Sequence, residues 1–103
     1  MTVNIMEQEK QPVTLNDIYE AWYKLKTRYR DAIVLLRNGE NYYAFEEDAD
    51  IITGAMGKEP APLWKERELC ILPHYEIDAF LSKVAKTGYR AAICEPVFFS
   101  LFQ

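Results

Sequence analysis

The chain has 103 residues, half of them hydrophobic and 14% aromatic, which is enough to bury the core of one domain and excludes wholesale disorder. Its formal net charge of −4 argues against a protein whose whole surface attracts nucleic acid, although a local basic face remains compatible with it. No run approaches the roughly 18 apolar residues of a membrane span, and the polar start has no secretory signal, so we expect a cytoplasmic protein without a membrane partner.

Residues 1–13 are polar and charged, and we expect a flexible leader followed by a single domain over residues 14–103. A first helix is predicted over about residues 15–29. Thr14 can cap its amino end, Asp17 suits its first turn, and apolar residues recur along it at spacings of three and four. These apolar residues are Leu15, Ile18, Trp22, Leu25 and Tyr29.

Two β-rich runs, residues 32–37 and 40–45, flank Asn38-Gly39 and predict a β-hairpin. A type I′ turn at these two residues would pair Arg37 with Glu40 and, further along, Leu35 with Tyr42. One face of the hairpin then carries Ile33, Leu35, Tyr42 and Ala44, and the other carries Val34, Leu36, Asn41, Tyr43 and Phe45. Because both faces are largely apolar, we expect both to be covered by other elements.

An acidic first turn, residues 46–48, opens a short second helix that its glycines weaken and end. The segment that follows, residues 57–68, contains two prolines and predicts an exposed loop. Leu63 and Trp64 are expected to anchor this loop to the body of the domain.

Two short buried strands are expected near the end of the chain, at residues 69–72 and 91–94. A third helix over about residues 75–87 separates them, and Gly88 suits the left-handed position just past its end. The tail from Val97 to Phe102 is almost wholly apolar. It is expected to supply a last strand, or to seek a protein partner or self-associate.

Residues that could carry catalysis are poorly grouped. His74 is the only histidine, and a structural role at the start of the third helix is favoured over a general base. The glycines form no phosphate-binding pattern, so no nucleotide cofactor is expected. The acidic run over residues 46–50 could offer carboxylates to Mg²⁺, but a solvated helix start is favoured. Cys70 and Cys94 lack metal-ligand spacing and are interpreted as buried thiols, so we expect neither an enzyme nor a metal or cofactor.

Basic residues gather between Trp22 and Arg37, where only Asp31 opposes them. Aromatic side chains are interleaved with them, and aromatics can stack on bases while cations contact phosphates. From this pattern alone, an ordinary solvated helix face with core aromatics is favoured over a nucleic-acid surface. The candidates for phosphate contacts are Lys24, Lys26, Arg28 and Arg30.

Two segments of the chain contain longer motifs. The first reads RNGENYYAFEEDA over residues 37–49, and the second, over residues 71–95, includes ILPHYEIDAFL and AAICE. They resemble the R-x-G-D-F-Y-E-x-F-x-x-D-A and P-x-H…A-[IV]-C-E-Q motifs of the amino-terminal domain, domain I, of the MutS mismatch-repair family. The resemblance covers roughly Thr14 to Glu95. It implies an α+β fold in which a mixed β-sheet of about four to five strands, including the Asn-Gly hairpin, packs with three helices.

The resemblance also implies a site. In that family a Phe-x-Glu pair follows the hairpin turn; the Phe wedges into the DNA minor groove and stacks on a mispaired base, and the Glu hydrogen-bonds to that base. The aligned positions here are Asn41 and Tyr43, so both mismatch-reading side chains are replaced. We therefore expect a non-catalytic DNA-binding module without family-style mismatch readout. Its contact residues at the hairpin tip would be Arg37, Asn38, Gly39, Asn41, Tyr42 and Tyr43.

A protein–protein interaction adaptor that keeps the fold but not DNA binding is the alternative. The acidic net charge, the missing wedge and the apolar tail favour it. Two observations separate the hypotheses: whether Asn41 and Tyr43 face outward, and whether the basic side chains of the first helix lie near the hairpin tip or point away from it.

Overall fold

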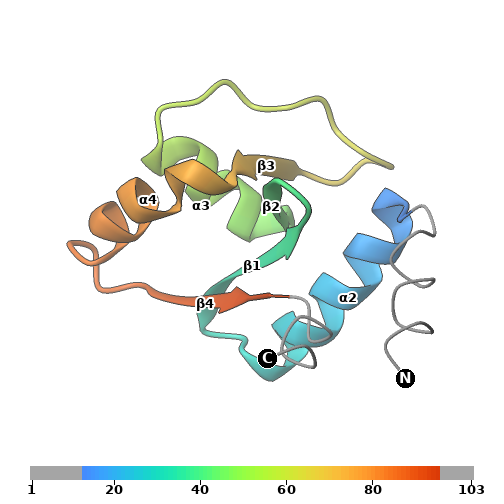
Figure 1. The fold of residues 1–103 in the computed structure, drawn as a ribbon, viewed down its shortest axis with the longest axis horizontal. Coiled ribbons are helices and arrows are strands. Elements are labelled where there is room, and N and C mark those ends of the chain that lie inside the picture. Colours follow the sequence, from blue (N-terminus) through green and yellow to red (C-terminus); the bar gives the residue numbers. More distant parts are fainter. Residues whose placement is uncertain (1–12, 96–103) are drawn as a thin grey trace.

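The computed structural model of the chain describes residues 13–95, which form a four-stranded sheet between two layers of helices (Figure 1). The helices are α2 (Leu15–Arg28), α3 (Glu46–Ala55) and α4 (Ile77–Val84), and the 3₁₀ turn η1 (His74–Glu76) precedes α4. The strands are β1 (Ala32–Asn38), β2 (Asn41–Phe45), β3 (Leu69–Pro73) and β4 (Arg90–Cys94). The predicted leader, apart from Val13, and the apolar tail at residues 97–102 lie outside the described residues.

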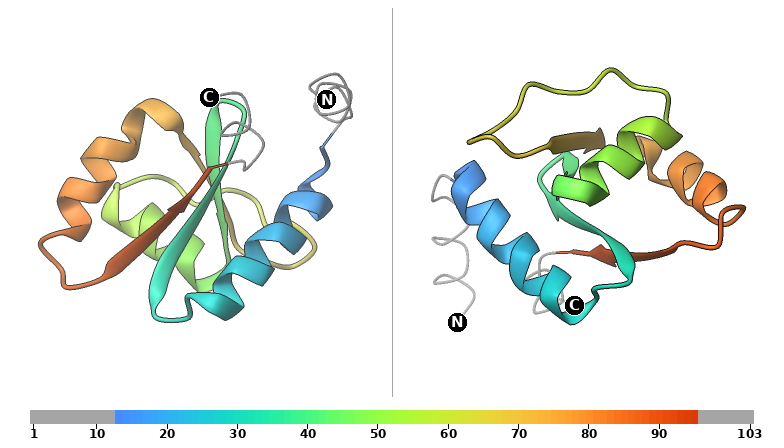
Figure 2. Two further views of the ribbon diagram at one scale, coloured as in Figure 1. Left: turned by 60° about the horizontal axis from the view of Figure 1, so that its bottom comes forward. Right: turned by 180° about the vertical axis from the view of Figure 1, so that it is seen from behind.

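The sheet is mixed, with the strand order β3-β2-β1-β4. Strand β2 runs antiparallel to both β1 and β3, whereas β4 runs parallel to β1. Helix α2 covers one face of this sheet, and α3 and α4 cover the other (Figure 2). The expected α+β fold with three helices and a mixed sheet is therefore confirmed. None of the helices in the described part of the chain is long and apolar enough to cross a membrane.

Helix α2 begins where its capping residues predict. The Thr14 hydroxyl oxygen accepts a hydrogen bond from the Asp17 backbone N–H at 3.1 Å, and the Asp17 carboxylate accepts one from the Thr14 N–H at 3.3 Å. This capping box satisfies two amide groups that the helix itself leaves free. Ile18 and Trp22 are buried from this helix, while Tyr29, expected on the same apolar stripe, is exposed.

The hairpin forms, but its register differs from the prediction. Leu36 pairs with Tyr43 and Asn38 pairs with Asn41, so the central turn residues are Gly39 and Glu40. Gly39 has φ +67°, whereas neither Asn38 nor Glu40 has a positive φ. A positive φ at the first central position alone is the pattern of a type II′ turn, in which glycine takes that position. The predicted type I′ turn at Asn38-Gly39 is thus wrong.

Each face of the hairpin is covered, as expected from its two apolar faces. Ile33, Leu35, Tyr42 and Ala44 pack with Ile52 of α3 and Phe80 of α4 in one core cluster. On the other face, Val34, Phe45 and Leu69 pack with Ile18 and Trp22 of α2 in a second cluster. The predicted division into two faces is confirmed. The observed pairing is displaced by one residue in each strand, and this leaves every side chain on its predicted face.

Three smaller expectations are corrected in the second half. Trp64 packs against the second cluster, which we call the α2-side core, but Leu63 is exposed and does not anchor the loop. The predicted third helix starts with the 3₁₀ turn η1 and ends at Val84, three residues earlier than expected. Cys70 is buried as predicted, whereas Cys94 is only half-buried. Gly57 and Gly88 have φ of +64° and +87°, consistent with their expected places after the two helices.

Candidate nucleic-acid interface

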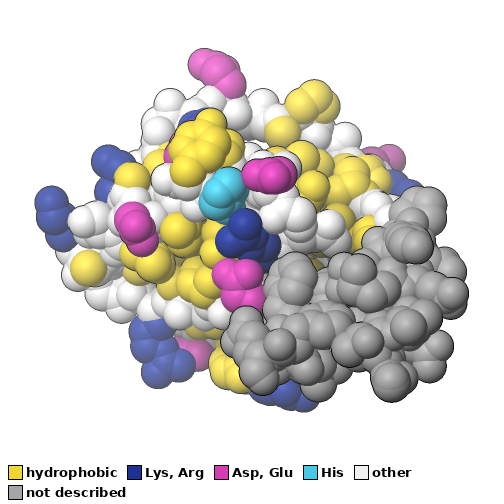
Figure 3. Space-filling model, viewed as in Figure 1, with side chains coloured by type: hydrophobic (Ala, Val, Ile, Leu, Met, Phe, Trp, Pro, Cys, Tyr) yellow, Lys and Arg dark blue, Asp and Glu magenta, His cyan; other side chains and the backbone are white. Residues whose placement is uncertain are grey.

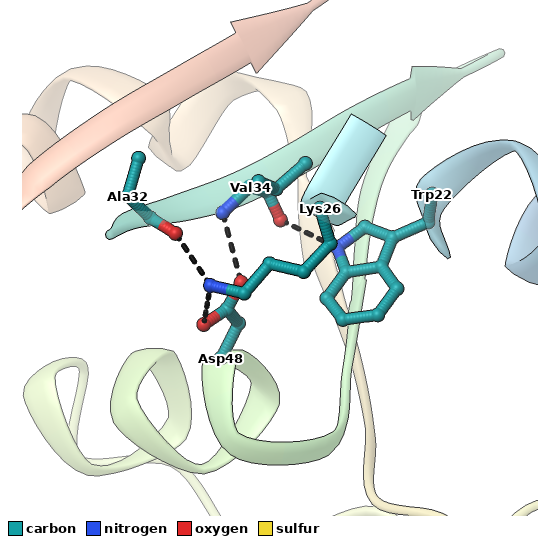
Figure 4. A network of polar contacts seen from close by, with 5 residues as sticks. All are labelled: Trp22, Lys26, Ala32, Val34 and Asp48. Carbon is teal, nitrogen blue, oxygen red and sulfur yellow. Dashed lines mark hydrogen bonds and ion pairs between the residues drawn. The ribbon is translucent and has the colours of Figure 1, made fainter. Parts of the chain in front are cut away.

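A polar network joins the carboxyl half of α2 to the start of β1 (Figure 4). The Lys26 ammonium group donates to the Ala32 carbonyl at 2.6 Å and contacts the Asp48 carboxylate at 3.0 Å. The second Asp48 oxygen accepts the Val34 N–H at 3.0 Å, and the Trp22 indole N–H donates to the Val34 carbonyl at 2.8 Å. Asp48 is 3% exposed, so its charge needs these partners.

This network corrects two expectations. Lys26 was predicted to contact phosphate, but its ammonium group is engaged inside the domain. Asp48 was expected to belong to a solvated helix start, with Mg²⁺ binding as the less favoured alternative, but it is buried and paired with Lys26. Among residues 13–95 no cluster of three or more acidic, histidine or cysteine side chains is arranged to hold a metal ion. Burial raises the pKa of the Cys70 and Cys94 thiols, which disfavours the reactive thiolate form.

The other predicted phosphate contacts are exposed but do not gather at the hairpin tip. Because Lys26 contacts Ala32 at the start of β1, the carboxyl end of α2 lies at that end of the strand. Arg28 and Arg30 follow there, whereas the tip lies beyond Asn38, at the other end of β1 (Figure 2). Lys24 lies on the outer side of α2. A continuous basic surface at the tip is therefore absent from the described residues, and the phosphate contacts stay a prediction.

On the α3/α4 side of the tip, the predicted residues are largely engaged with one another. Tyr42 is 4% exposed, and its hydroxyl donates to the Glu95 carboxylate at 2.7 Å. Burial, and next to it this hydrogen bond, raises the pKa of Tyr42. Arg37 donates to the Gly39 carbonyl at 3.0 Å and lies 4.0 Å from Glu95. Tyr42 is thus a core residue and not the surface contact that we expected.

His74 ties the end of β3 to the hairpin turn. Its backbone N–H donates to the Glu40 carbonyl at 2.9 Å, and its Nδ1 lies 3.0 Å from the same oxygen. The Glu40 carboxylate lies 3.5 Å from Nδ1. These contacts give His74 the structural role that was favoured. Figure 3 shows the histidine beside acidic and basic side chains on this face, and the ion pairs there join Arg37 with Glu95 and His74 with Glu40.

The opposite side of the tip carries a surface that α2 does not cover. Cross-strand partners share a face of the sheet, and two rows lie beyond the buried row of Val34, Phe45 and Leu69. The first row is Leu36, Tyr43 and Ile71; the second is Asn38, Asn41 and Pro73. We call Leu36, Asn38, Asn41, Tyr43 and Ile71 the tip strip.

The tip strip keeps a partly exposed surface. Ile71 is 42% exposed, and the four residues of the hairpin in the strip are half-buried. Tyr43 and Leu36 also pack against the α2-side core, so the strip is fixed to the scaffold. Two amides between apolar side chains can hydrogen-bond to base edges and pack against sugars or bases. Ile71 was expected in a buried strand; only its register opposite Tyr43 reveals its exposure.

Comparison with known proteins matches most of the chain to one family. A family model described as MutS domain I matches residues 16–98. DNA mismatch repair protein MutS of Thermodesulfovibrio yellowstonii is 32% identical over 87 residues, and that of Thermosipho melanesiensis is 34% identical over 86. The protein of the same name from Porphyromonas gingivalis is 30% identical over 89 residues. These alignments cover 79–82% of this chain and 10% of each relative, so the chain spans about a tenth of the length of these relatives.

Proposed function

The chain belongs to the MutS domain I family, and from this membership we propose that it is a non-catalytic DNA-binding module that acts in the cytoplasm. One observation carries the proposal: Asn41 and Tyr43 are partly exposed neighbours on one face of the sheet, beyond the row that α2 buries, at the positions where the resemblance places the mismatch-reading pair. Had both been buried under a helix, the hairpin would offer no surface to DNA.

The chemistry of the tip strip determines what it can read. The Asn38 and Asn41 amides can donate to and accept from groove edges, and Leu36, Tyr43 and Ile71 add apolar contact. Asn41 has no aromatic ring that could unstack a base step. Neither Asn41 nor Tyr43 has a carboxylate that could accept a hydrogen bond from a base. The module therefore binds DNA with little preference for a mismatch.

Fluorescence anisotropy of the purified chain tests this function. Perfect duplex, G·T-mismatched duplex and single-stranded DNA are titrated over a series of salt concentrations. We expect binding that weakens as salt rises and affinities for the two duplexes that agree within about threefold. Absence of binding to all three DNAs at low salt would overturn the proposal.

A matched pair of variants tests the location. Asn41→Asp places a negative charge in the tip strip and should weaken duplex binding at least about fivefold, since a carboxylate there repels phosphate. Ser82→Asp adds the same charge on an exposed position of α4, on the other side of the sheet, and should change binding little. Equal losses in both variants would mean that the strip is not the contact surface.

A protein–protein adaptor is the second candidate, and the charges favour it, because the exposed cations of α2 do not gather at the hairpin tip. Arg37 lies 4.0 Å from Glu95, the Glu40 carboxylate lies 3.5 Å from His74, and Lys26 is engaged with the buried Asp48. This candidate predicts no DNA binding, together with a dimer or hetero-complex in analytical ultracentrifugation. Deletion of residues 97–103, which contain the apolar tail, should abolish that association.

A further inference from the structure

A groove on the outer side of α2 combines aromatic rings with cations. It is open to solvent, has a volume of about 430 Å³ and is lined by Tyr19, Glu20, Tyr23, Lys24 and Arg67. Four of these residues come from α2, where Tyr19 and Tyr23, like Glu20 and Lys24, are neighbours one helical turn apart. Arg67 comes from the segment that precedes β3, so the groove forms only in the folded domain.

The floor of the groove is held in place. Tyr19 donates from its hydroxyl to the Glu46 carboxylate at 2.8 Å and makes an edge contact with the buried Phe45 ring, with centroids 5.1 Å apart. The Arg67 guanidinium carbon lies 4.5 Å from the Tyr19 ring centroid. Tyr23, whose ring centroid is 6.0 Å from that of Tyr19, is 51% exposed. The Tyr19 ring is thus held in place, and about half of the surface of Tyr23 is open to solvent.

The charges around the groove divide into engaged and available groups. Arg67 lies 3.5 Å from Glu46, whereas the Glu20 carboxylate accepts only from the neutral Asn16 amide, at 3.5 Å, and keeps its negative charge. Within the described part of the chain, no carboxylate lies within 4.0 Å of the Lys24 ammonium group. The groove therefore places an available cation beside an exposed aromatic ring, which complements a phosphate next to a flat base.

We propose that this groove binds one unpaired nucleotide of DNA, with its base stacked on Tyr23 and its phosphate at Lys24. The inference rests on the proposed DNA-binding function and adds a second contact, separate from the tip strip. A base within a duplex is stacked on both faces and cannot lie on Tyr23. A single strand offers such faces freely, so the groove selects single-stranded DNA over duplex.

Two exposed tyrosines of the same chain provide a matched test by anisotropy. Tyr23→Leu removes the stacking ring and keeps an apolar side chain, and should weaken binding of a short oligothymidylate about tenfold, the loss expected for one base–aromatic stack. Duplex binding should change less than about twofold, since duplex uses the tip strip. Tyr29→Leu removes an exposed ring outside the groove and should alter neither. A 2-aminopurine base in the oligonucleotide should lose fluorescence on binding the parent chain, and much less with Tyr23→Leu.

The outcomes separate this inference from the proposed function. If duplex binds but Tyr23→Leu retains full affinity for the single strand, the groove inference is overturned and the tip strip stands. Loss of single-strand binding in Lys24→Gln alone would indicate attraction of phosphate without stacking, which also contradicts the inference. If neither DNA binds the parent chain, the proposed function itself fails.

Discussion

The Asp48 carboxylate connects α2, β1 and α3 through one side chain. It pairs with Lys26 and accepts the buried Val34 N–H, so Asp48→Ala removes both interactions. We expect this substitution to lower the free energy of unfolding by about 3 kcal/mol, at the low end for a broken buried pair because the Lys26 side chain is 25% exposed. Urea denaturation followed by tryptophan fluorescence measures the loss.

Glu47→Ala is the control for this prediction. Glu47 is the exposed neighbour of Asp48 on α3 and forms no ion pair among the described residues. Its substitution should change the free energy of unfolding by less than about 0.5 kcal/mol. A loss in Asp48→Ala as small as this would show that the network does not stabilise the domain.

The titration of Tyr42 should make the stability of the folded domain depend on pH in the alkaline range. Its pKa in the folded chain is raised above the ordinary value of about 10 by burial and by the bond to Glu95. The folded state therefore holds the phenolic proton more tightly, so this contribution is complete below about pH 10 and is lost as pH rises through the folded pKa. The stability advantage of the parent over Tyr42→Phe should shrink from pH 9 to pH 11 in urea titrations. Curves that stay parallel over that range would contradict the expected proton linkage.

At the scale of elements, the hairpin turn gives a direct test of register. Gly39 has a positive φ, and Asn38 lies in β1 with no positive φ. Gly39→Ala should therefore destabilise the domain by about 1 kcal/mol, whereas Asn38→Val should be close to neutral. If the turn were centred on Asn38-Gly39, valine at 38 would be strained and its cost would exceed that of alanine at 39. Thermal unfolding of the two variants distinguishes these registers.

Gly54→Ala supplies a control of opposite sign. Gly54 lies in α3 with an ordinary φ, and a Cβ there would meet no atom within 4 Å. Alanine should therefore stabilise the domain by about 0.5–1 kcal/mol, through helix propensity and a less flexible unfolded chain. Destabilisation at this position would mean that backbone entropy does not govern these glycine substitutions.

The hairpin also shows which features the sequence can predict. Alternation of apolar residues fixed the two faces, and a shift of one residue in each strand leaves the faces unchanged. The prediction of the turn used only the local preference of Asn-Gly for type I′ turns. That preference contains no information about the contact between His74 and the Glu40 carbonyl. Contacts between distant segments, such as Lys26 with Asp48, were likewise outside the reach of local patterns. Of the tip strip, Asn38, Asn41 and Tyr43 were predicted as contacts, whereas Leu36 and Ile71 were not, because their place in the strip follows only from the strand register.

At the scale of the whole molecule, the charge distribution limits how strongly salt should affect DNA binding. Lys26 is engaged internally and Arg37 lies near Glu95, which leaves Lys24, Arg28 and Arg30 as the exposed predicted phosphate contacts. Because these cations do not gather at the hairpin tip, three neutralised phosphates are an upper limit, so the log–log slope of affinity against salt on duplex DNA should be no steeper than about −2.7. The salt series of anisotropy titrations measures this slope. A slope twice as steep would require phosphate contacts from cations that we have not assigned.

A restored wedge tests whether the scaffold still presents position 41 to DNA. Asn41→Phe places the aromatic ring of the family motif in the outer row of the tip strip, at a side chain that is partly exposed. If the fold by itself is enough to direct a ring at position 41 into the minor groove, the preference for a G·T-mismatched duplex over a perfect one should rise about fivefold. This rise corresponds to about 1 kcal/mol. Asn38→Phe, one strand away on the same face, is the control and should leave both duplex affinities nearly equal. Tyr43 is left intact because it packs against the α2-side core, so any gain comes from the ring itself. Equal mismatch preference in both variants would mean that a ring anywhere on the strip suffices and that position 41 has no special approach to the groove.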